Sequence, residues 1–270
     1  MRIQHNIMAM NAYRNYSTNT SALSKNLEKL SSGYKINRAG DDAAGLAISE
    51  KMRSQITGLT MAKKNAKDGI SMVQTAEGAL TEVHDMLNRM VELATQSANG
   101  TYATEDRGYL NQEFDQLKAE INRIGSNSNF NGQALFVTTK VTLQIGEKGA
   151  AAYQLSFQVG KLTTQSLGVQ SANVNSATAA AAAISTINAA IKTVNGMRAT
   201  LGATQNRLEH TINNLGVMTE NIQDAESTIR DTDIADEMMA YTKNNILIQS
   251  AQAMLAQANQ VPQGVLQLLQ

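Results

Sequence analysis

The sequence predicts a mainly α-helical protein made of long antiparallel helical rods in a coiled coil, with a small β-hairpin and terminal helices that pair as a separate inner domain. Three observations support this fold class. Apolar residues recur at alternating steps of three and four over most of the chain, as in helices that pack along one another. A single proline, Pro262, occurs in 270 residues, so little interrupts long helices. The apolar period changes to two only in the middle of the chain.

The composition excludes several classes of function. Basic and acidic residues balance at 23 each, which leaves no net field to attract nucleic acid. There is no cysteine, so neither disulfides nor thiolate chemistry is available. No apolar run reaches the length of a membrane span, and the first residues lack the pattern of a cleaved secretory signal. We therefore expect no nucleic-acid or membrane partner, and either a cytoplasmic protein or one exported without cleavage.

The N-terminal segment is predicted to be helical with a break or a shifted face. It carries two apolar triplets that are one residue out of heptad phase with each other: Ile3, Ile7 and Met10, then Leu23, Leu27 and Leu30. Gly40 favours a turn after them, and Asp41 or Asp42 is predicted to cap the next helix. Adjacent carboxylates could also be a metal or acid–base pair, but before a helix they are more often caps.

The next helix is predicted to be long, because a three–four apolar alternation runs from Leu59 to Ala94 and ends at Asn99-Gly100. A second helix begins at Thr104 and stops at Gly125. Alternating apolar residues then predict a β-hairpin, with strands around 141–145 and 153–159. From Ser176 the helical period returns on one heptad lattice. Its apolar members are Ile184, Ile187, Ile191, Val194, Leu201, Leu208, Ile212, Leu215, Ile222 and Ile229.

An acidic patch at 231–237 separates this helix from the C-terminal segment. It lacks the glycine and the twelfth-position glutamate of a calcium loop, so a solvated joint or an ion-pairing face between subunits is the better interpretation.

The C-terminal segment has no charged side chain from Asn244 to Gln270, yet its apolar residues keep heptad spacing. A terminus is normally polar and frayed. We therefore expect this line of apolar residues, the seam, to be buried against the N-terminal triplets, against other copies of the chain, or against both. A membrane-surface helix would carry Lys or Arg on its polar face, and this one does not. The predicted polymerisation seam consists of Ile3, Ile7, Met10, Leu23, Leu27, Leu247, Met254, Val261, Val265 and Leu268.

Several segments in order along the chain resemble bacterial flagellins, in a short form without the outer variable domains. They are residues 30–49 (LSSGYKINRAGDDAAGLAIS), 74–80 (QTAEGAL), 92–99 (ELATQSAN), 129–132 (NFNG), 201–208 (LGATQNRL) and 261–266 (VPQGVL).

The resemblance implies a subunit of the flagellar filament, exported through the flagellar type III apparatus and located outside the cell. Residues 1–45 and 231–270 would form the inner domain and its joint. Residues 46–175 and 176–230 would form the next layer. The implied partners are further copies, an export chaperone, the filament cap and hook–filament junction proteins. The alternative function is a hook–filament junction protein, which shares the terminal helices.

The resemblance also implies binding to Toll-like receptor 5, an innate immune receptor. The positions that match the receptor-binding segment are Arg89, Leu93, Gln96 and Glu113. The alternative is that Arg89 and Glu113 are ordinary surface charges or subunit contacts. The sequence departs from the family at Val91, where receptor-active members often carry a second arginine.

We expect no enzyme, cofactor or metal site. The histidines His5, His84 and His210 are far apart in the sequence, and no metal-binding or nucleophile motif accompanies them.

Overall fold

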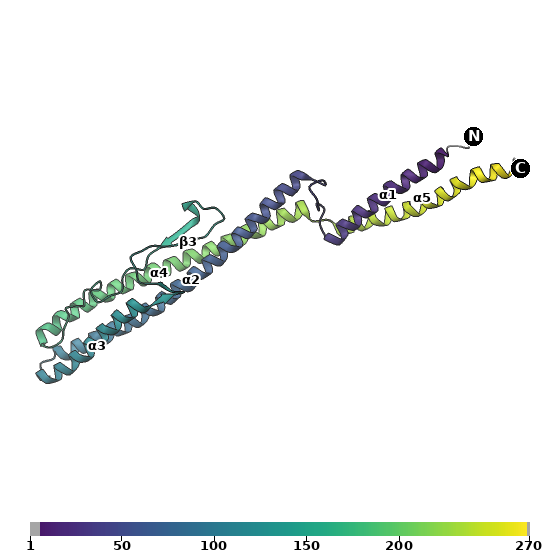
Figure 1. The fold of residues 1–270 in the computed structure, drawn as a ribbon. Helices are drawn as coiled ribbons and strands as arrows, with labels where there is room; N and C mark the ends of the chain where they lie inside the picture. Colours follow the sequence, from purple (N-terminus) through teal and green to yellow (C-terminus); the bar gives the residue numbers. More distant parts are fainter. Residues whose placement is uncertain (1–5, 269–270) are drawn as a thin grey trace. The chain divides into compact units, whose positions relative to one another are not determined.

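A computed structural model of the protein describes the backbone of residues 6–268 and the side chains of residues 6–261. Helices dominate this range, and the strands are short (Figure 1). The helices are α1 (Ile7–Ser32), α2 (Ala43–Ala98), α3 (Thr104–Asn127), α4 (Ala177–Arg230) and α5 (Ile234–Leu268). The strands are β1 (Asn129–Phe130), β2 (Gln133–Ala134), β3 (Val141–Gln144) and β4 (Gln154–Phe157), with a single 3₁₀ turn, η1 (Ala151–Tyr153), before β4.

The chain divides into two compact units, of which the first combines two segments that are distant in sequence and the second is continuous. Unit 1 contains Met1–Ile56 and Glu220–Gln270, and unit 2 contains Thr57–Thr219. The helices α2 and α4 contribute residues to both. The mainly α-helical fold with long helices and small antiparallel strand pairs is confirmed. Which residues form which layer of a filament stays a prediction.

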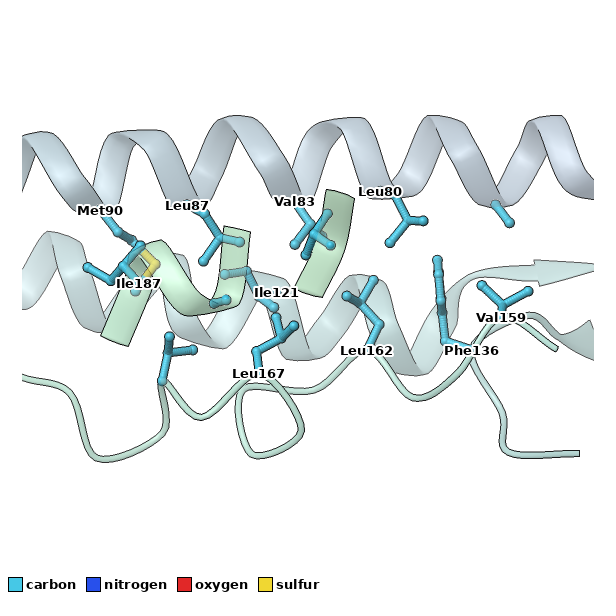
Figure 2. Packing of buried hydrophobic residues seen from close by; sticks show 14 of the residues in the cluster. Leu80, Val83, Leu87, Met90, Ile121, Phe136, Val159, Leu162, Leu167 and Ile187 are labelled. Carbon is cyan, nitrogen blue, oxygen red and sulfur yellow. The ribbon is translucent and has the colours of Figure 1, made fainter. Parts of the chain in front are cut away.

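Unit 2 has an apolar core in which the predicted helical stripes meet. Figure 2 shows Leu80, Val83, Leu87 and Met90 of α2 pointing into the core, in which Ile121 and Ile187 also lie. A buried side chain of this size contributes roughly 1.5–3 kcal/mol, so this core is the main source of stability in the unit. The stripe predicted for α2 is buried throughout: Leu59, Ala62, Ala66, Gly69, Val73, Ala76, Leu80, Val83, Leu87, Met90 and Ala94.

The β-hairpin is confirmed as an antiparallel pair of β3 and β4. Val141 lies opposite Phe157, and Leu143 lies opposite Leu155. Leu155 and Phe157 are buried, while the residues between them face solvent, as the period of two predicts. The side-chain amide of Asn65 in α2 donates to the Gln144 carbonyl at 3.0 Å, which fastens the hairpin to the helix.

An irregular segment, residues 158–176, completes the core and was not predicted from the sequence. Its Leu162 and Val169 are fully buried, and Leu167 is nearly so. In Figure 2 Leu162 and Leu167 lie on the side of the core opposite α2. Polar side chains of α3 hold the backbone of this segment. Asn122 accepts from the Thr164 N–H at 2.9 Å, Asn111 accepts from the Val174 N–H at 3.1 Å, and Lys118 donates to the Ala172 carbonyl at 2.9 Å.

The prediction that α3 stops at Gly125 is wrong, because the helix continues to Asn127. The glycine has a packing role instead. A Cβ at Gly125 would overlap the backbone carbonyl of Leu162. Its missing side chain therefore lets the irregular segment lie directly on α3.

The turns of unit 1 are held by carboxylate caps and by backbone pairing. Asp42 is confirmed as a cap, since its Oδ1 accepts from the N–H groups of Ala44 and Gly45 at 3.1 and 2.9 Å. The Asp41 carboxylate accepts from the Arg38 N–H at 3.0 Å, which lowers the pKa of Asp41. In the acidic patch, Asp233 caps α5.

Backbone pairing joins the end of α1 to the end of α4 within unit 1. Gly33 ends α1 in the left-handed region, with φ of 75°, which a glycine adopts without strain. The Lys35 N–H donates to the Arg230 carbonyl at 2.7 Å, and the Thr232 N–H donates to the Gly33 carbonyl at 3.0 Å. The segment that follows α1 is therefore hydrogen-bonded to the segment that links α4 to α5.

In the described range, one helix is long and apolar enough by length and composition to cross a membrane. It is α4, in which an 18-residue window has a mean hydropathy of 1.2. The helix is rich in alanine, and its larger apolar residues Ile187, Val194 and Leu201 are fully buried in the unit 2 core. A core helix of this composition passes the same test, so the finding is weak support for a membrane span.

Candidate self-association surface

The terminal helices α1 and α5 pack antiparallel in unit 1. Asn6 caps α1 and donates its side-chain amide to the Ala258 carbonyl at 2.7 Å. Toward the other end of α1, the Lys29 Nζ lies 3.5 Å from the Glu237 carboxylate. These two contacts fix the direction and the register of the pair. Pairing of the terminal helices, as the sequence predicted, is confirmed.

The contact between α1 and α5 is made by alanines, by asparagines and by larger side chains that are only half-covered. On α1 the covered and half-covered residues include Ala9, Ala12, Tyr16, Asn19, Ala22, Leu23 and Asn26, and on α5 they include Ala240, Tyr241, Asn244, Ile248, Ala251, Leu255 and Ala258. Alanine lets two helices approach closely but buries little apolar area. Because the larger side chains on this face are only half-covered, the interface buries little apolar area, and we call it thin in this sense.

A polar cluster lies within this interface. Asn26 is 9 % exposed. Its amide, oriented so that both of its atoms are satisfied, donates to the Glu237 carboxylate and accepts from the Asn244 side chain, both at 3.0 Å. A buried asparagine in a helix pair fixes the register at a cost in stability. Sequence reasoning missed Asn26, although an asparagine between Leu23 and Leu30 was a visible signal.

Pairing of α1 with α5 leaves large apolar residues uncovered. Leu247, Met254 and Val261 follow one line of α5 at spacings of seven and are 39, 63 and 41 % exposed. On α1, Ile7, Met10 and Leu27 are 59, 64 and 48 % exposed. We call these six residues the open seam. Isolated exposed apolar residues are ordinary, but aligned ones mark an interaction surface.

The expectation that the N-terminal triplets cover part of the C-terminal seam within one chain is wrong for Ile7 and Met10. They point away from α5, because α1 turns its alanine and asparagine side toward that helix. The helix is also unbroken from Ile7 to Ser32, so the change of heptad phase does not interrupt it. Leu23 is half-buried. The side chains of Ile3, Val265 and Leu268 lie outside the described residues.

Further apolar side chains, which were not predicted from the sequence, are exposed on α1 and α5. Met8 and Tyr13 are exposed on α1. On α5, Met238, Met239 and Ile246 are exposed and, with Thr242 and Lys243, line a shallow groove of about 410 Å³.

A second surface, in unit 2, contains the residues that matched the receptor-binding segment. The Arg89 guanidinium of α2 donates to Glu113 of α3 at 2.8 Å and to Glu92 at 2.9 Å. These hydrogen bonds, first of all the one to Glu113, raise the pKa of Arg89 above its ordinary value. Gln96 is exposed and donates to the Tyr102 hydroxyl at 2.8 Å. Arg89, Glu113 and Gln96 are thus together on one exposed surface.

Leu93 does not belong to that exposed surface. It is 1 % exposed and is part of the unit 2 core. The step from Met90 to Leu93 is three residues, which keeps Leu93 on the buried side of α2. The expectation that its side chain contacts a receptor is therefore corrected, and its role is to support the helix under Arg89.

The fold and the open seam together define a class of protein: a helical structural protein whose paired terminal helices expose large apolar residues. Comparison with known proteins agrees with this class. The profile of the bacterial flagellin N-terminal helical region matches residues 3–140, and that of the C-terminal helical region matches residues 184–269. The chain belongs to the flagellin family.

Curated relatives extend over the whole chain. A flagellin of Halalkalibacterium halodurans is 53 % identical over 271 residues, covering 100 % of both chains. The flagellar filament 33 kDa core protein of Treponema phagedenis is 48 % identical, also with 100 % of both chains covered. The crystal structure of Bacillus cereus flagellin is 34 % identical with a TM-score of 0.50, covering 56 % of this chain and 88 % of that one.

The protein is therefore a structural subunit of the bacterial flagellar filament, the extracellular polymer used for motility. The family is one of structural proteins, and its members polymerise. These relatives favour the filament subunit over the alternative of a hook–filament junction protein.

Proposed function

We propose that the open seam is the surface through which copies of this chain polymerise, together with Leu23, Ile3, Val265 and Leu268. The observation that carries the proposal is the alignment of Leu247, Met254 and Val261 on the side of α5 that α1 leaves uncovered. Covering side chains of this size, already partly buried, is worth about 1 kcal/mol each. Six such residues per subunit supply several kcal/mol to each copy that joins.

A charge placed in the open seam tests the proposal. We expect Met254→Lys to raise the critical concentration for salt-induced assembly at least about tenfold, because a lysine ammonium would be buried without a partner. The matched control is Gln252→Lys, which adds the same charge at an exposed polar position of α5. Assembly would be measured by sedimentation and electron microscopy, with circular dichroism to confirm equal helix content. Equal assembly of the two variants would overturn the proposal.

The export and assembly partners follow from membership of the family and from the thin α1–α5 contact. The subunit is secreted through the flagellar type III apparatus without cleavage, is held by an export chaperone, and adds at the distal end under the filament cap, beyond hook–filament junction proteins. Helices joined mainly through alanine and asparagine suit a chain that travels unfolded and orders on arrival.

Hydrogen exchange tests this coupling of folding to assembly. Residues 1–36 and 238–270 are expected to exchange fast in the dilute subunit and slowly in the filament, while the amides of α2 around Leu87 are slow in both. Slow exchange of the two terminal segments in the dilute subunit would contradict the idea that they order on incorporation.

A second function is binding to Toll-like receptor 5 through Arg89, Gln96 and Glu113. The observation in its favour is that the Glu113 and Glu92 carboxylates hold the Arg89 guanidinium in one position on an exposed surface. A charged group already ordered before binding loses less conformational entropy on forming a complex. Leu93 contributes by supporting the helix from within the core.

Gel filtration of the subunit with the receptor ectodomain tests this surface. Arg89→Ala is expected to abolish the complex that the unmodified subunit forms. Arg123→Ala is the matched control, because Arg123 is also paired to a glutamate on an exposed part of α3. If the complex survives Arg89→Ala, or is lost equally in both variants, the proposed receptor surface is incorrect.

A further inference from the structure

We propose that the exposed methionines of the terminal helices are an oxidation site that determines whether a free subunit can enter the filament. These terminal methionines are Met8, Met10, Met238, Met239 and Met254. The reactant is a peroxide such as hydrogen peroxide, and the product is methionine sulfoxide. The inference deepens the polymerisation proposal and rests on it.

The exposed methionines are concentrated on the terminal helices. Among the described side chains, seven methionines are exposed, and five of them lie on α1 or α5. Met8, Met10, Met239 and Met254 are 63–65 % exposed. By contrast, Met72 and Met90 in the unit 2 core are 5 and 0 % exposed. Because the chain has no cysteine, methionine is its only readily oxidised sulfur.

Two of these side chains lie on the proposed assembly surface, and the other three lie on the same two helices. Met10 and Met254 belong to the open seam, and Met238 and Met239 line the groove on α5. Methionine fits irregular apolar contacts because its side chain is flexible and its sulfur is polarisable. The feature that makes these residues suitable for packing against a second copy also places their sulfur atoms within reach of solvent in the free subunit.

The chemistry is an oxygen transfer. A lone pair of the thioether sulfur attacks one peroxide oxygen, the O–O bond breaks, and the S–O bond forms. The second oxygen leaves as water after proton transfer, so one thioether and one H₂O₂ give one sulfoxide and one H₂O. The sulfur loses two electrons and the peroxide gains them. A thiol-dependent reductase reverses the step, giving the thioether, a disulfide and water.

Oxidation changes the surface from apolar to polar. A sulfoxide oxygen is a strong hydrogen-bond acceptor, and burying it without a donor is unfavourable. In the filament, in contrast, the covered sulfur atoms are out of reach of peroxide. Oxidation therefore acts on the subunit before incorporation and leaves the assembled filament intact.

Peptide mass spectrometry after peroxide treatment tests whether the methionine sulfur atoms are accessible to peroxide in the free subunit and in the filament. In the free subunit the five terminal methionines are expected to oxidise much faster than Met90. In the filament, Met10 and Met254 should oxidise as slowly as Met90, whereas an oxidation rate equal to that in the free subunit would overturn the inference.

An assembly assay with oxidised subunits tests whether oxidation prevents incorporation into the filament. Oxidised subunits are expected to lose assembly, and reductase treatment is expected to restore it. A variant with leucine at all five positions should assemble and should resist peroxide. The matched control carries Met61→Leu and Met218→Leu, which removes exposed methionines of unit 2 and should leave the subunit peroxide-sensitive. If the five-leucine variant does not assemble, Met10→Leu with Met254→Leu replaces it, and reductase rescue of the unmodified subunit decides independently.

The outcomes separate this inference from the proposal on which it rests. If oxidised subunits assemble normally while Met254→Lys blocks assembly, the open seam stands and the oxidation site is overturned. If Met254→Lys assembles like its control, the open seam itself is wrong. Two further outcomes would overturn the inference. In the first, the reductase does not restore assembly of oxidised subunits. In the second, the variant with Met61→Leu and Met218→Leu is resistant to peroxide.

Discussion

Unit 2 and the α1–α5 pair of unit 1 use the same helical apolar repeat in opposite ways. In unit 2 the large residues Leu80 and Leu87 are fully buried inside one chain. In the α1–α5 pair the large residues Leu247 and Met254 are exposed, while alanine, asparagine and half-covered larger side chains make the contact within the chain. The comparison teaches that a heptad stripe predicts burial but does not say whether the covering partner lies in the same chain.

The physical reason is the number of layers around each helix. In unit 2, α2 is covered by α3, α4, the hairpin and the irregular segment, so its stripe is enclosed. A pair of helices can cover only one side of each member. The remaining sides of α1 and α5 have no cover within the described part of the chain, and they carry the apolar residues that a polymer would bury.

Truncating one leucine in each region gives the largest expected contrast. Leu87→Ala should lower the free energy of unfolding by about 2–5 kcal/mol, because it leaves a cavity in a closed core. Leu27→Ala removes the same atoms from a side chain that is 48 % exposed, so the stability of the subunit should change little while its assembly weakens. Urea unfolding and sedimentation measure the two effects. A large loss of subunit stability in Leu27→Ala would contradict the comparison.

A smaller effect is expected from the polar cluster between α1 and α5. Asn26→Ala leaves the Glu237 carboxylate with fewer partners, which should destabilise the helix pair by about 1–2 kcal/mol. In filaments this corresponds to roughly tenfold faster hydrogen exchange in α1. Ser24→Ala, at an exposed position of the same helix, is the control. If both variants exchange alike, Asn26 does not fix the register of the pair.

The sequence was sufficient for much of unit 2. The stripe from Leu59 to Ala94 could be predicted because it is periodic and its partners lie in the same chain. Leu162 and Leu167 could not, since they follow no period and lie in an irregular segment whose backbone is held to α3 by hydrogen bonds at Thr164 and Ala172. The resemblance to a family also could not tell that Leu93 points inward.

In unit 1 the open seam is part of the set of residues that the sequence predicted, but the side of α1 that contacts α5 was not predicted. Spacings of seven selected Leu247, Met254 and Val261 correctly as one line of α5. The side of α1 that contacts α5 is marked by alanine and asparagine, which an apolar pattern does not detect. Small residues permit close approach, and this determined which side of α1 faces inward.

A pH titration tests how much the ion pair between Arg230 and Glu50 contributes to the stability of unit 1. The Arg230 guanidinium donates to Glu50 at 2.6 Å, and this bond lowers the pKa of Glu50 below its ordinary value of 4.5. A lowered pKa in the folded state means that the contribution is complete above 4.5 and is lost as the pH falls through the folded-state pKa. Thermal unfolding by circular dichroism should therefore show the unmodified protein losing more stability on acidification than Glu50→Gln. A constant difference between the two proteins at all pH values would exclude this role of Glu50.

The smallest effect is expected at Arg89 of unit 2, which also donates hydrogen bonds to carboxylates but is more exposed than Arg230. Its side chain is 49 % exposed, compared with 12 % for Arg230. Exposed ion pairs contribute little, because water solvates the separated charges almost as well. Arg89→Met should leave the melting temperature nearly unchanged, whereas Arg230→Met, which also removes the stacking on the Tyr34 ring at 4.8 Å, should lower it. Equal losses in the two variants would mean that the exposed ion pair of unit 2 contributes as much stability as the more covered one of unit 1, and this contrast between the two units would then fail.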